Sequence, residues 1–563
     1  MKKLMSMALA ATFALSSAVL VTGCQTKDNI AKDPTTINVR LYKAGFGDTF
    51  IYELKQKFEE VYKEKNYKMN ILTPTYDSAG TPMIQEMASG YDKTQIDLYI
   101  TGAVFPNQVS PYGEYSNGTA LCEDLEELVF NQTAIGYDGK ESSDKISDRL
   151  MDDYEPFLRD DYGTMYGFTW AQTTAGLVVN TSKLATYGIT ELPRTTDELF
   201  EVFDAIYNGA NGVPGSETTK TYPVTYNLET GSGGAAGYQN CAMLSWFAQY
   251  DIDTYNNFLR MQTYSNGTWT DMEEGWKVFE NENLKEVLEA GYQFMDEKYA
   301  ARGSATHKLD QAQGLIMKKS NNQNNAVFML NGDWFLNEVK ANYSKNLDDI
   351  SFMNVPVISA LGTKLFGAGT KYALNDADCD DLLSNICKLV DENKTIDEII
   401  QGIKETMNIE LDRAAAEKVA TARGVCFARG IEHLAFITKN STKKDIAAKV
   451  LRMMASDDFA ETFVTKANAA SPYVKNTAAT SQYKFVNQAK DLGANIHFRA
   501  INSRKQALRV KVLKSDYFIP GIDNLALTLY NKAATKSYAD AAQELYNSTL
   551  TRAQEDWNTY KNS

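Results

Sequence analysis

The chain of 563 residues is long enough for two large hydrophobic cores, and its hydrophobic content of 44% and charged content of 23% are those of a globular protein. Its formal net charge of -15 argues against nucleic acid as a partner, because that affinity depends on clustered lysine and arginine. Beyond the first two dozen residues, no stretch is apolar enough and long enough to span a bilayer.

The first feature along the chain is a secretory leader. Two lysines precede an apolar run, and small residues stand where that run stops, which is the pattern of a cleavable signal. Cys24 directly follows Gly23, so the leader resembles that of a bacterial lipoprotein. The resemblance implies a signal peptide over 1–24, a lipid on Cys24, and a protein held outside the cell membrane without spanning it. A transmembrane anchor is less favoured, because a polar tether over 25–36 follows the cleavage position.

A first α/β pattern begins after the tether. Apolar and polar residues alternate over 37–41, the period of a half-buried strand, and Asp48 can cap the helix that follows. The pattern continues with a strand over 68–73, a helix from Thr81 to Gly90 and a strand over 95–101. This order predicts a parallel sheet with right-handed crossovers.

A second α/β pattern occupies the middle of the chain, and no internal repeat is present. Thr195 and Glu198 have the spacing of a capping box at the start of a helix. The other elements predicted in chain order are a strand over 176–180, a helix over 283–299, a strand over 326–330, a helix from about Trp334, a strand over 432–438 and a helix from Ser441 or Thr442 to about 456.

The segment over 376–422 is an acidic and then helical insertion. Asp376, Asp378 and Asp380 superficially match the start of a calcium loop. However, Asp381 stands where that loop requires glycine, and Cys387 where it requires glutamate. An acidic helix N-terminus is therefore the favoured interpretation.

Cysteine and histidine give no sign of a metal or redox centre. Five cysteines besides Cys24 are widely spaced, and an odd number in an exported chain does not describe a disulfide framework. Buried free thiols are expected, with one bridge among Cys379, Cys387 and Cys426 left open. The three histidines are isolated in the sequence, so we expect no metal and no cofactor.

Candidate binding residues follow the predicted strands. Ligands of open parallel sheets bind beyond the carboxyl ends of the strands. The aromatic and polar residues at such ends are Tyr42, Phe46, Asp48, Thr101, Asp333 and Trp334, and Trp170 lies in an aromatic segment just before another strand. Helix capping is an equal alternative for Asp48 and Asp333. Apolar packing is the alternative for Trp334.

This mixture of residues suits a sugar. Aromatic faces pack on the apolar side of a sugar ring, while polar side chains bind its hydroxyl rim. Each buried polar group left unpaired costs about 1–3 kcal/mol, so such groups select hydroxyl geometry.

Several segments together resemble a known family. They are Gln95–Tyr99, Tyr166–Phe168 followed by Gly176–Asn180, Ala326–Trp334, and Leu434–Ser456. In this order they resemble the extracellular solute-binding proteins of sugar-importing ABC transporters, the group that contains maltose-binding protein. The resemblance covers most of residues 37–540, and no single motif carries it.

The resemblance implies an α/β, two-lobed periplasmic-binding-protein-like fold of type II, with a hinge and a ligand cleft between the lobes. The implied N-terminal lobe covers 37–171 and 428–475. The implied C-terminal lobe covers 172–427 and 476–563 and contains the 376–422 insertion.

The resemblance also implies roles for particular residues. The family's ring-stacking tryptophan falls on Trp334, and its polar contacts after the first strand fall on Tyr42 to Asp48. Its further contacts fall on Thr101, Tyr226, Asn227 and Asp523. Thr169 and Trp170 replace the usual proline, which alters the edge of the implied pocket.

The implied function is that of a lipid-anchored, monomeric, non-enzymatic receptor outside the cytoplasm. It would capture a carbohydrate, most simply an oligosaccharide, and present it to ABC permease subunits. A surface-anchored glycoside hydrolase stays open, because carboxylate pairs are too common among 72 acidic residues to be located from sequence. A receptor for a peptide or another non-sugar solute also stays open.

Overall fold

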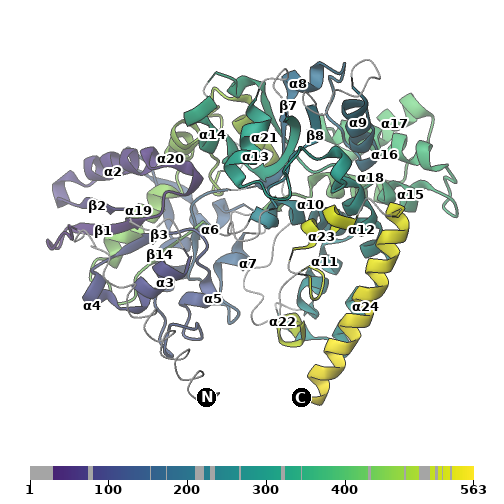
Figure 1. Ribbon diagram of the computed structural model, residues 1–563. Helices are drawn as coiled ribbons and strands as arrows, with labels where there is room; N and C mark the ends of the chain where they lie inside the picture. The colour runs from purple at the N-terminus through teal and green to yellow at the C-terminus, as the bar shows by residue number, and fades with distance from the viewer. Residues whose placement is uncertain are drawn as a thin grey trace, which may run out of the picture.

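The protein folds into two lobes, each built around its own β-sheet (Figure 1). The computed structural model describes residues 29–73, 80–151, 154–172, 174–209, 221–228, 235–265, 268–318, 324–343, 345–428, 433–474, 477–493, 508–513, 518–522, 524–532 and 536–563. The mixed α/β, two-lobed fold expected from the sequence is confirmed. The predicted leader over 1–24, which includes the predicted lipidation residue Cys24, and the candidate residue Asp523 lie outside the described residues.

The first lobe contains a five-stranded sheet that the chain enters twice. Its strand order is β2 (Lys68–Leu72), β1 (Thr36–Leu41), β3 (Leu98–Ile100), β14 (Leu434–Ile437) and β6 (Phe168–Thr169). β1 pairs in parallel with β2 and β3, as the order of strands and helices predicted, whereas β14 runs antiparallel to β3 and β6. The helices around this sheet include α2 (Thr49–Val61), α3 (Gly80–Ala88) and α19 (Lys444–Met454).

The second lobe contains another five-stranded sheet. Its order is β12 (Ile350–Met353), β7 (Thr174–Asn180), β11 (Asn325–Gly332) and β8 (Thr221–Val224), with β13 (Phe427–Ala428) also paired to β7. All residues of β7 and β11 are buried, which explains why both strands are continuous rather than alternating in hydrophobicity. α9 (Thr196–Asn208), α10 (Ala235–Tyr250), α12 (Asn283–Phe294), α13 (Leu309–Met317) and α21 (Lys484–Gly493) belong to this lobe.

Shorter elements complete each lobe. Those of the first are η1 (Ala44–Phe46), η2 (Lys63–Lys65), α4 (Tyr91–Thr94), α5 (Pro106–Val109), η3 (Glu126–Phe130), β4 (Thr133–Ile135), β5 (Glu141–Lys145), α6 (Ile146–Arg149), α7 (Glu155–Leu158), α20 (Asp457–Thr462) and η8 (Phe463–Ala467). Those of the second are α8 (Thr181–Ala185), α11 (Ile252–Arg260), β9 (Gln262–Ser265), β10 (Thr268–Asp271), η4 (Gly275–Glu280), η5 (Glu297–Tyr299), α14 (Phe335–Tyr343), η6 (Leu347–Asp349), α22 (Leu508–Leu513) and α23 (Leu525–Lys532). The long C-terminal α24 (Tyr538–Asn562), yellow in Figure 1, runs along the outer side of the second lobe.

The chain crosses between the two sheets at defined places. It leaves the first sheet after β6, enters the second at β7, and returns between β13 and β14. Backbone bonds hold the crossing segments together: Trp170 N–H donates to His433 O (3.0 Å), and Gln172 N–H donates to Ala470 O (2.9 Å). Residues that are far apart in the sequence therefore meet where the lobes adjoin.

The insertion is helical, as predicted. It consists of α16 (Asp376–Asp391), α17 (Ile396–Met407) and α18 (Arg413–Gly424), and α16 packs on α15 (Ser359–Phe366) of the second lobe. Asn375 caps α16 by accepting a bond from Asp378 N–H (3.0 Å), so the acidic residues lie in a helix rather than in a calcium loop.

Three predicted helix starts differ in detail. Asp48 stands at the N-cap of α2 without a capping bond, because its carboxylate pairs with Lys43 Nζ at 2.5 Å. Thr195 caps α9 as predicted (3.2 Å to Glu198 N), but the Glu198 carboxylate accepts from Arg194 N–H instead of completing the capping box. α19 begins after Lys443 rather than at Ser441 or Thr442.

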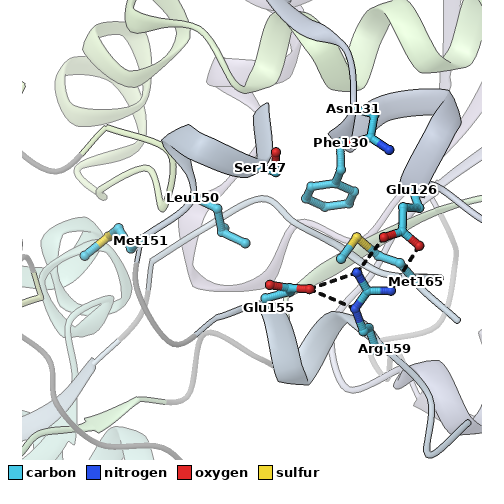
Figure 2. A pocket seen from close by; sticks show the side chains of 9 residues that line it. All are labelled: Glu126, Phe130, Asn131, Ser147, Leu150, Met151, Glu155, Arg159 and Met165. Carbon is cyan, nitrogen blue, oxygen red and sulfur yellow. Dashed lines mark hydrogen bonds and ion pairs between the residues drawn. The ribbon is translucent and has the colours of Figure 1, made fainter. Parts of the chain in front are cut away.

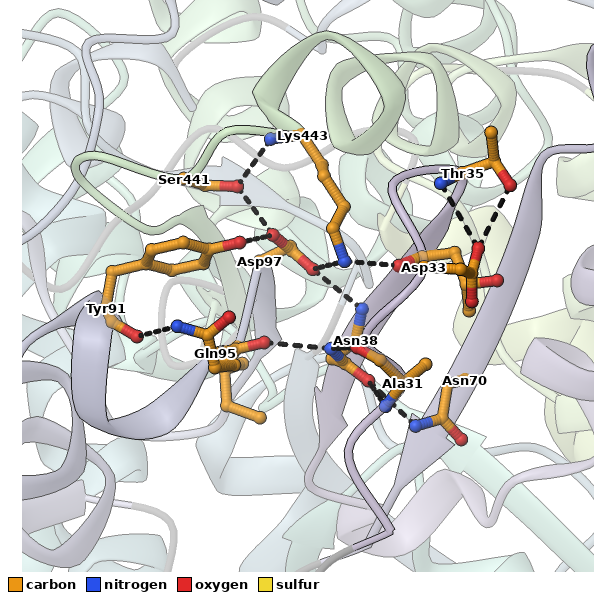
Figure 3. Close-up of polar contacts among 12 residues, drawn as sticks. Ala31, Asp33, Thr35, Asn38, Asn70, Tyr91, Gln95, Asp97, Ser441 and Lys443 are labelled. Atoms are coloured by element: carbon orange, nitrogen blue, oxygen red, sulfur yellow. Dashed lines mark hydrogen bonds and ion pairs between the residues drawn. The ribbon is translucent and has the colours of Figure 1, made fainter.

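Ser441 instead belongs to a buried polar network around Asp97 (Figure 3). Asp97 is fully buried and accepts bonds from Ser441 Oγ (2.6 Å), Tyr91 Oη (2.8 Å) and Asn38 N (2.8 Å). Lys443 Nζ lies 3.6 Å from the same carboxylate and donates to Thr36 O (2.6 Å). A buried carboxylate must be fully hydrogen-bonded, and here it joins β1, β3 and the segment before α19.

Two further features of the described residues concern membrane-spanning helices and the cysteines. Among them, no helix has the length and apolar character needed to cross a membrane. The five cysteines that the structure describes are all buried and free, which answers the open question of a bridge among Cys379, Cys387 and Cys426.

Candidate functional site

Four rings from both lobes meet at the junction of the two sheets. Phe46 of η1 lies edge-on to Trp170 (centroids 5.5 Å apart), to Trp334 (6.4 Å) and to His433 (5.3 Å). His433 in turn lies 5.2 Å from Trp170 and 6.0 Å from Trp334, and Tyr238 of α10 approaches Trp334 at 6.0 Å. We call Phe46, Trp170, Trp334 and His433 the junction cluster.

Strand ends position this cluster. Phe46 follows the end of β1, and Trp334 follows the end of β11. His433 immediately precedes β14, and Trp170 immediately follows β6. The strand-end argument thus brings Phe46, Trp170 and Trp334 together, as ligand sites of α/β sheets require.

Trp334 packs directly against the first lobe. A methyl group added at Gly45 would lie 2.8 Å from Trp334 Cβ, so only glycine permits this approach. On its own side the indole lies over Gly332, where an added methyl would lie 2.4 Å from Trp334 Cζ2. Trp334 is only 8% exposed, so a ligand can reach its faces only if the lobes separate.

Two of the predicted residues are satisfied by the protein itself. Trp170 is buried, stacks on Phe50 (5.7 Å) and donates its indole N–H to Thr101 O (3.0 Å). The hydroxyl of Thr101 donates to Leu434 O (2.7 Å). Trp170, held in this way, contacts the ring of Phe46 edge-on.

The other predicted residues fall into two groups. Tyr42 and Asp48 are half-buried and stand before and after η1, the element that carries Phe46 of the junction cluster. Tyr226 and Asn227 are fully buried; Tyr226 donates its hydroxyl to Phe294 O at the end of α12. The ring contacts of Tyr226 are with Phe294 and Tyr530, not with the junction cluster.

Asp333 occupies the most unusual electrostatic position at the junction. It is 7% exposed, and burial raises the pKa of its carboxyl well above the ordinary value. Thr174 N–H donates to Oδ2 (3.3 Å), while Oδ1 has no partner in the structure. The unpaired oxygen Oδ1 is therefore available for a further hydrogen bond.

Sequence reasoning missed His433 and Tyr238. The three histidines looked isolated, and only the return of the chain at β14 brings His433 against the tryptophans. The sequence placed His433 inside the strand predicted over 432–438, whereas in the structure it directly precedes β14. No group of three His, Cys, Asp or Glu side chains among the described residues is arranged to hold a metal ion.

A cavity of about 430 Å³ lies elsewhere, within the first lobe (Figure 2). It is bordered by η3, α6 and α7, and Phe130, Leu150 and Met165 form part of its wall. Arg159 Nη2 lies 2.8 Å from carboxylate oxygens of both Glu126 and Glu155, so its charge is already matched. None of the predicted ligand residues lines this cavity, so we place the candidate site at the junction instead.

Comparisons with known proteins support the fold. No protein-family model and no curated protein sequence matches the chain. The structure of the apo-form of RafE from Streptococcus pneumoniae matches with a TM-score of 0.55 at 11% identity, covering 94% of this chain and 99% of that one. RafE in complex with raffinose gives 0.51 at 10% identity (93% and 99% covered), and maltose-bound MalE3 of T. maritima gives 0.50 at 12% identity (92% and 99% covered). The chain has the two-lobed fold of these solute-binding proteins.

Proposed function

We propose that this protein is a lipid-anchored, extracytoplasmic receptor that captures a carbohydrate and presents it to the permease subunits of an ABC importer. The observation that carries the proposal is the junction cluster, in which ring side chains at strand ends of both lobes meet. RafE and MalE3, which share the fold, are recorded with raffinose and with maltose. The proposed lobes are those predicted, 37–171 with 428–475 and 172–427 with 476–563.

The proposed binding mechanism is capture by lobe closure. The lobes open, a sugar ring enters beside Trp334 and Phe46, and closure buries it between them. A ligand shifts such an equilibrium only by its preference for one state, and contacts made to both lobes supply that preference. We propose Trp334, Phe46 and Asp333 as ligand contacts, with Tyr42 and Asp48 at the rim.

Calorimetry on a protein that begins at residue 25 tests the proposal. Raffinose, maltose and longer oligosaccharides are titrated into the wild type, Trp334→Ala and Trp269→Ala. Trp269 serves as the matched control, because its ring meets Tyr264 and Arg260 instead of the junction cluster. We expect at least one sugar to bind, Trp334→Ala to weaken it at least tenfold, and Trp269→Ala to leave it unchanged.

Four further measurements test the alternatives, the lipid anchor and the oligomeric state. Incubation with the bound sugar should give no cleavage products, whereas a glycoside hydrolase would release them. Mass spectrometry of ligand retained on purification should show a saccharide; a peptide there would overturn the proposal. In cells, Cys24→Ala should release the protein from the membrane fraction, and gel filtration should show a monomer.

A further inference from the structure

Three buried polar atoms at the junction have no hydrogen-bond partner in the structure. They are Asp333 Oδ1, Thr174 Oγ1 and Tyr154 Oη. Asp333 is 7% exposed, Tyr154 4% and Thr174 0%. Leaving such an atom unpaired costs about 1–3 kcal/mol, so three in one region call for an explanation.

Asp333 and Thr174 are fixed against each other by the backbone. Asp333 N–H donates to Thr174 O (3.0 Å), and Thr174 N–H donates back to Asp333 Oδ2 (3.3 Å). These two bonds join the end of β11 to the start of β7 and hold the carboxyl in one orientation. Its second oxygen and the threonine hydroxyl are left with unused bonding capacity beside Trp334.

Tyr154 comes to the same region from the first lobe. Met151 N–H donates to Pro472 O (2.9 Å), and Gln172 N–H donates to Ala470 O (2.9 Å). The segment leading to Tyr154 therefore runs beside the same 470–472 stretch as the segment leading to Thr174. Burial raises the pKa of the Tyr154 hydroxyl, and Asp333 is the ionisable group that acts on it most strongly.

The chemistry of these groups restricts the ligand. A phenol and a threonine hydroxyl each donate and accept hydrogen bonds, and the free carboxyl oxygen of Asp333 accepts them. An anion would require a positive group, which none of the three supplies. A neutral hydroxyl, which also donates and accepts, matches all three.

We propose that Asp333, Thr174 and Tyr154 form a subsite that receives one hydroxyl of the bound carbohydrate and that this hydroxyl bridges the two lobes. This inference rests on the proposed function and assigns specificity to residues that the sequence did not single out. Because Tyr154 belongs to one lobe and Asp333 to the other, the bridged hydroxyl stabilises only the arrangement in which the lobes adjoin.

The test uses Tyr154→Phe, which removes a single oxygen atom, with Tyr473→Phe as the matched control. The Tyr473 hydroxyl is also buried without a partner, but its ring stacks on Phe168 inside the first lobe (4.8 Å). Each variant is measured twice: its melting temperature without sugar, and its affinity by calorimetry for the raffinose- or maltose-type sugar that the wild type binds. Thr174→Val is a second variant that keeps the shape of the side chain.

Without sugar, we expect Tyr154→Phe to melt at the wild-type temperature or above, because it removes an unsatisfied group. A melting temperature lower by several degrees would show that the hydroxyl has a partner in the unliganded protein, and would overturn the inference whether or not any sugar binds.

With sugar, we expect Tyr154→Phe and Thr174→Val to weaken binding at least fivefold and Tyr473→Phe to leave it unchanged. A monodeoxy sugar lacking the bridging hydroxyl should bind the wild type and Tyr154→Phe equally. Wild-type affinity in Tyr154→Phe would refute the subsite while leaving the proposed function intact. Failure of the wild type to bind any sugar would refute the proposed function itself.

Discussion

The contact between Gly45 and Trp334 offers a direct test of how the lobes fit together. In Gly45→Ala the new methyl would lie 2.8 Å from Trp334 Cβ and 3.0 Å from Cγ, whereas ordinary contacts begin near 3.4 Å. The overlap is about 0.6 Å, and overpacking of this kind costs about 1–3 kcal/mol. Gly332 and the edge-on ring of Phe46 (6.4 Å) both restrict rotation of the indole.

We therefore expect the lobes themselves to move apart. A cost of about 1–3 kcal/mol shifts the equilibrium roughly 5- to 150-fold toward arrangements in which η1 and Trp334 are separated. Small-angle X-ray scattering without sugar should show a larger radius of gyration, and tryptophan fluorescence should shift to longer wavelength as Trp334 becomes exposed.

Gly80→Ala is the control for this experiment. Its added methyl would meet only Ala103 O, at an ordinary 3.4 Å, so neither signal should change. If Gly45→Ala gave the same radius of gyration and the same fluorescence as the wild type, the packing of Trp334 against the first lobe, and the reasoning drawn from it, would be refuted.

Three further predictions concern the interior. Burial lowers the pKa of Lys183 to about 7, although Nζ donates to three backbone carbonyls. The pKa of an unfolded lysine is near 10.4, so between pH 7 and 10.4 the unfolded state binds more protons than the folded state. The free energy of unfolding of the wild type should therefore rise by up to about 5 kcal/mol over this pH range, relative to that of Lys183→Met. If urea unfolding gave a difference in free energy between the two proteins that stayed constant over this pH range, the prediction would be contradicted. Trp170→Phe leaves Thr101 O without its indole donor and should cost about 1–3 kcal/mol in the same assay; an unchanged midpoint would show that the bond contributes nothing. A thiol reagent should find no reactive cysteine in the folded protein from residue 25 onward and five after denaturation, because all five are buried and free; fewer than five would reveal a disulfide.

Much of the local structure could be predicted because it depends on neighbours in the sequence. Alternation over 37–41 predicted β1, although all six of its residues are buried and the predicted half-burial is wrong; Thr195 at the start of an apolar stripe predicted the cap of α9. The helical insertion followed from the spacing of its apolar residues. The two failed helix caps have different causes. Asp48 pairs with its sequence neighbour Lys43, whereas Ser441 bonds to Asp97, which lies 344 residues away in the sequence.

The order of α/β elements could thus be predicted from the sequence alone, because it depends on local spacing, whereas the leader stays a prediction. Which of the candidate side chains meet was decided only by the tertiary structure. Trp334 was predicted as a ligand contact from its strand end and Tyr226 from the family resemblance, yet the fold buries Tyr226 against α12 and places Trp334 against the opposite lobe. His433 and Tyr154 reach the junction through crossings between the sheets, and no local pattern records that approach. The physical reason is that burial and pairing depend on long-range packing, whereas periodicity reports only the face of a single element.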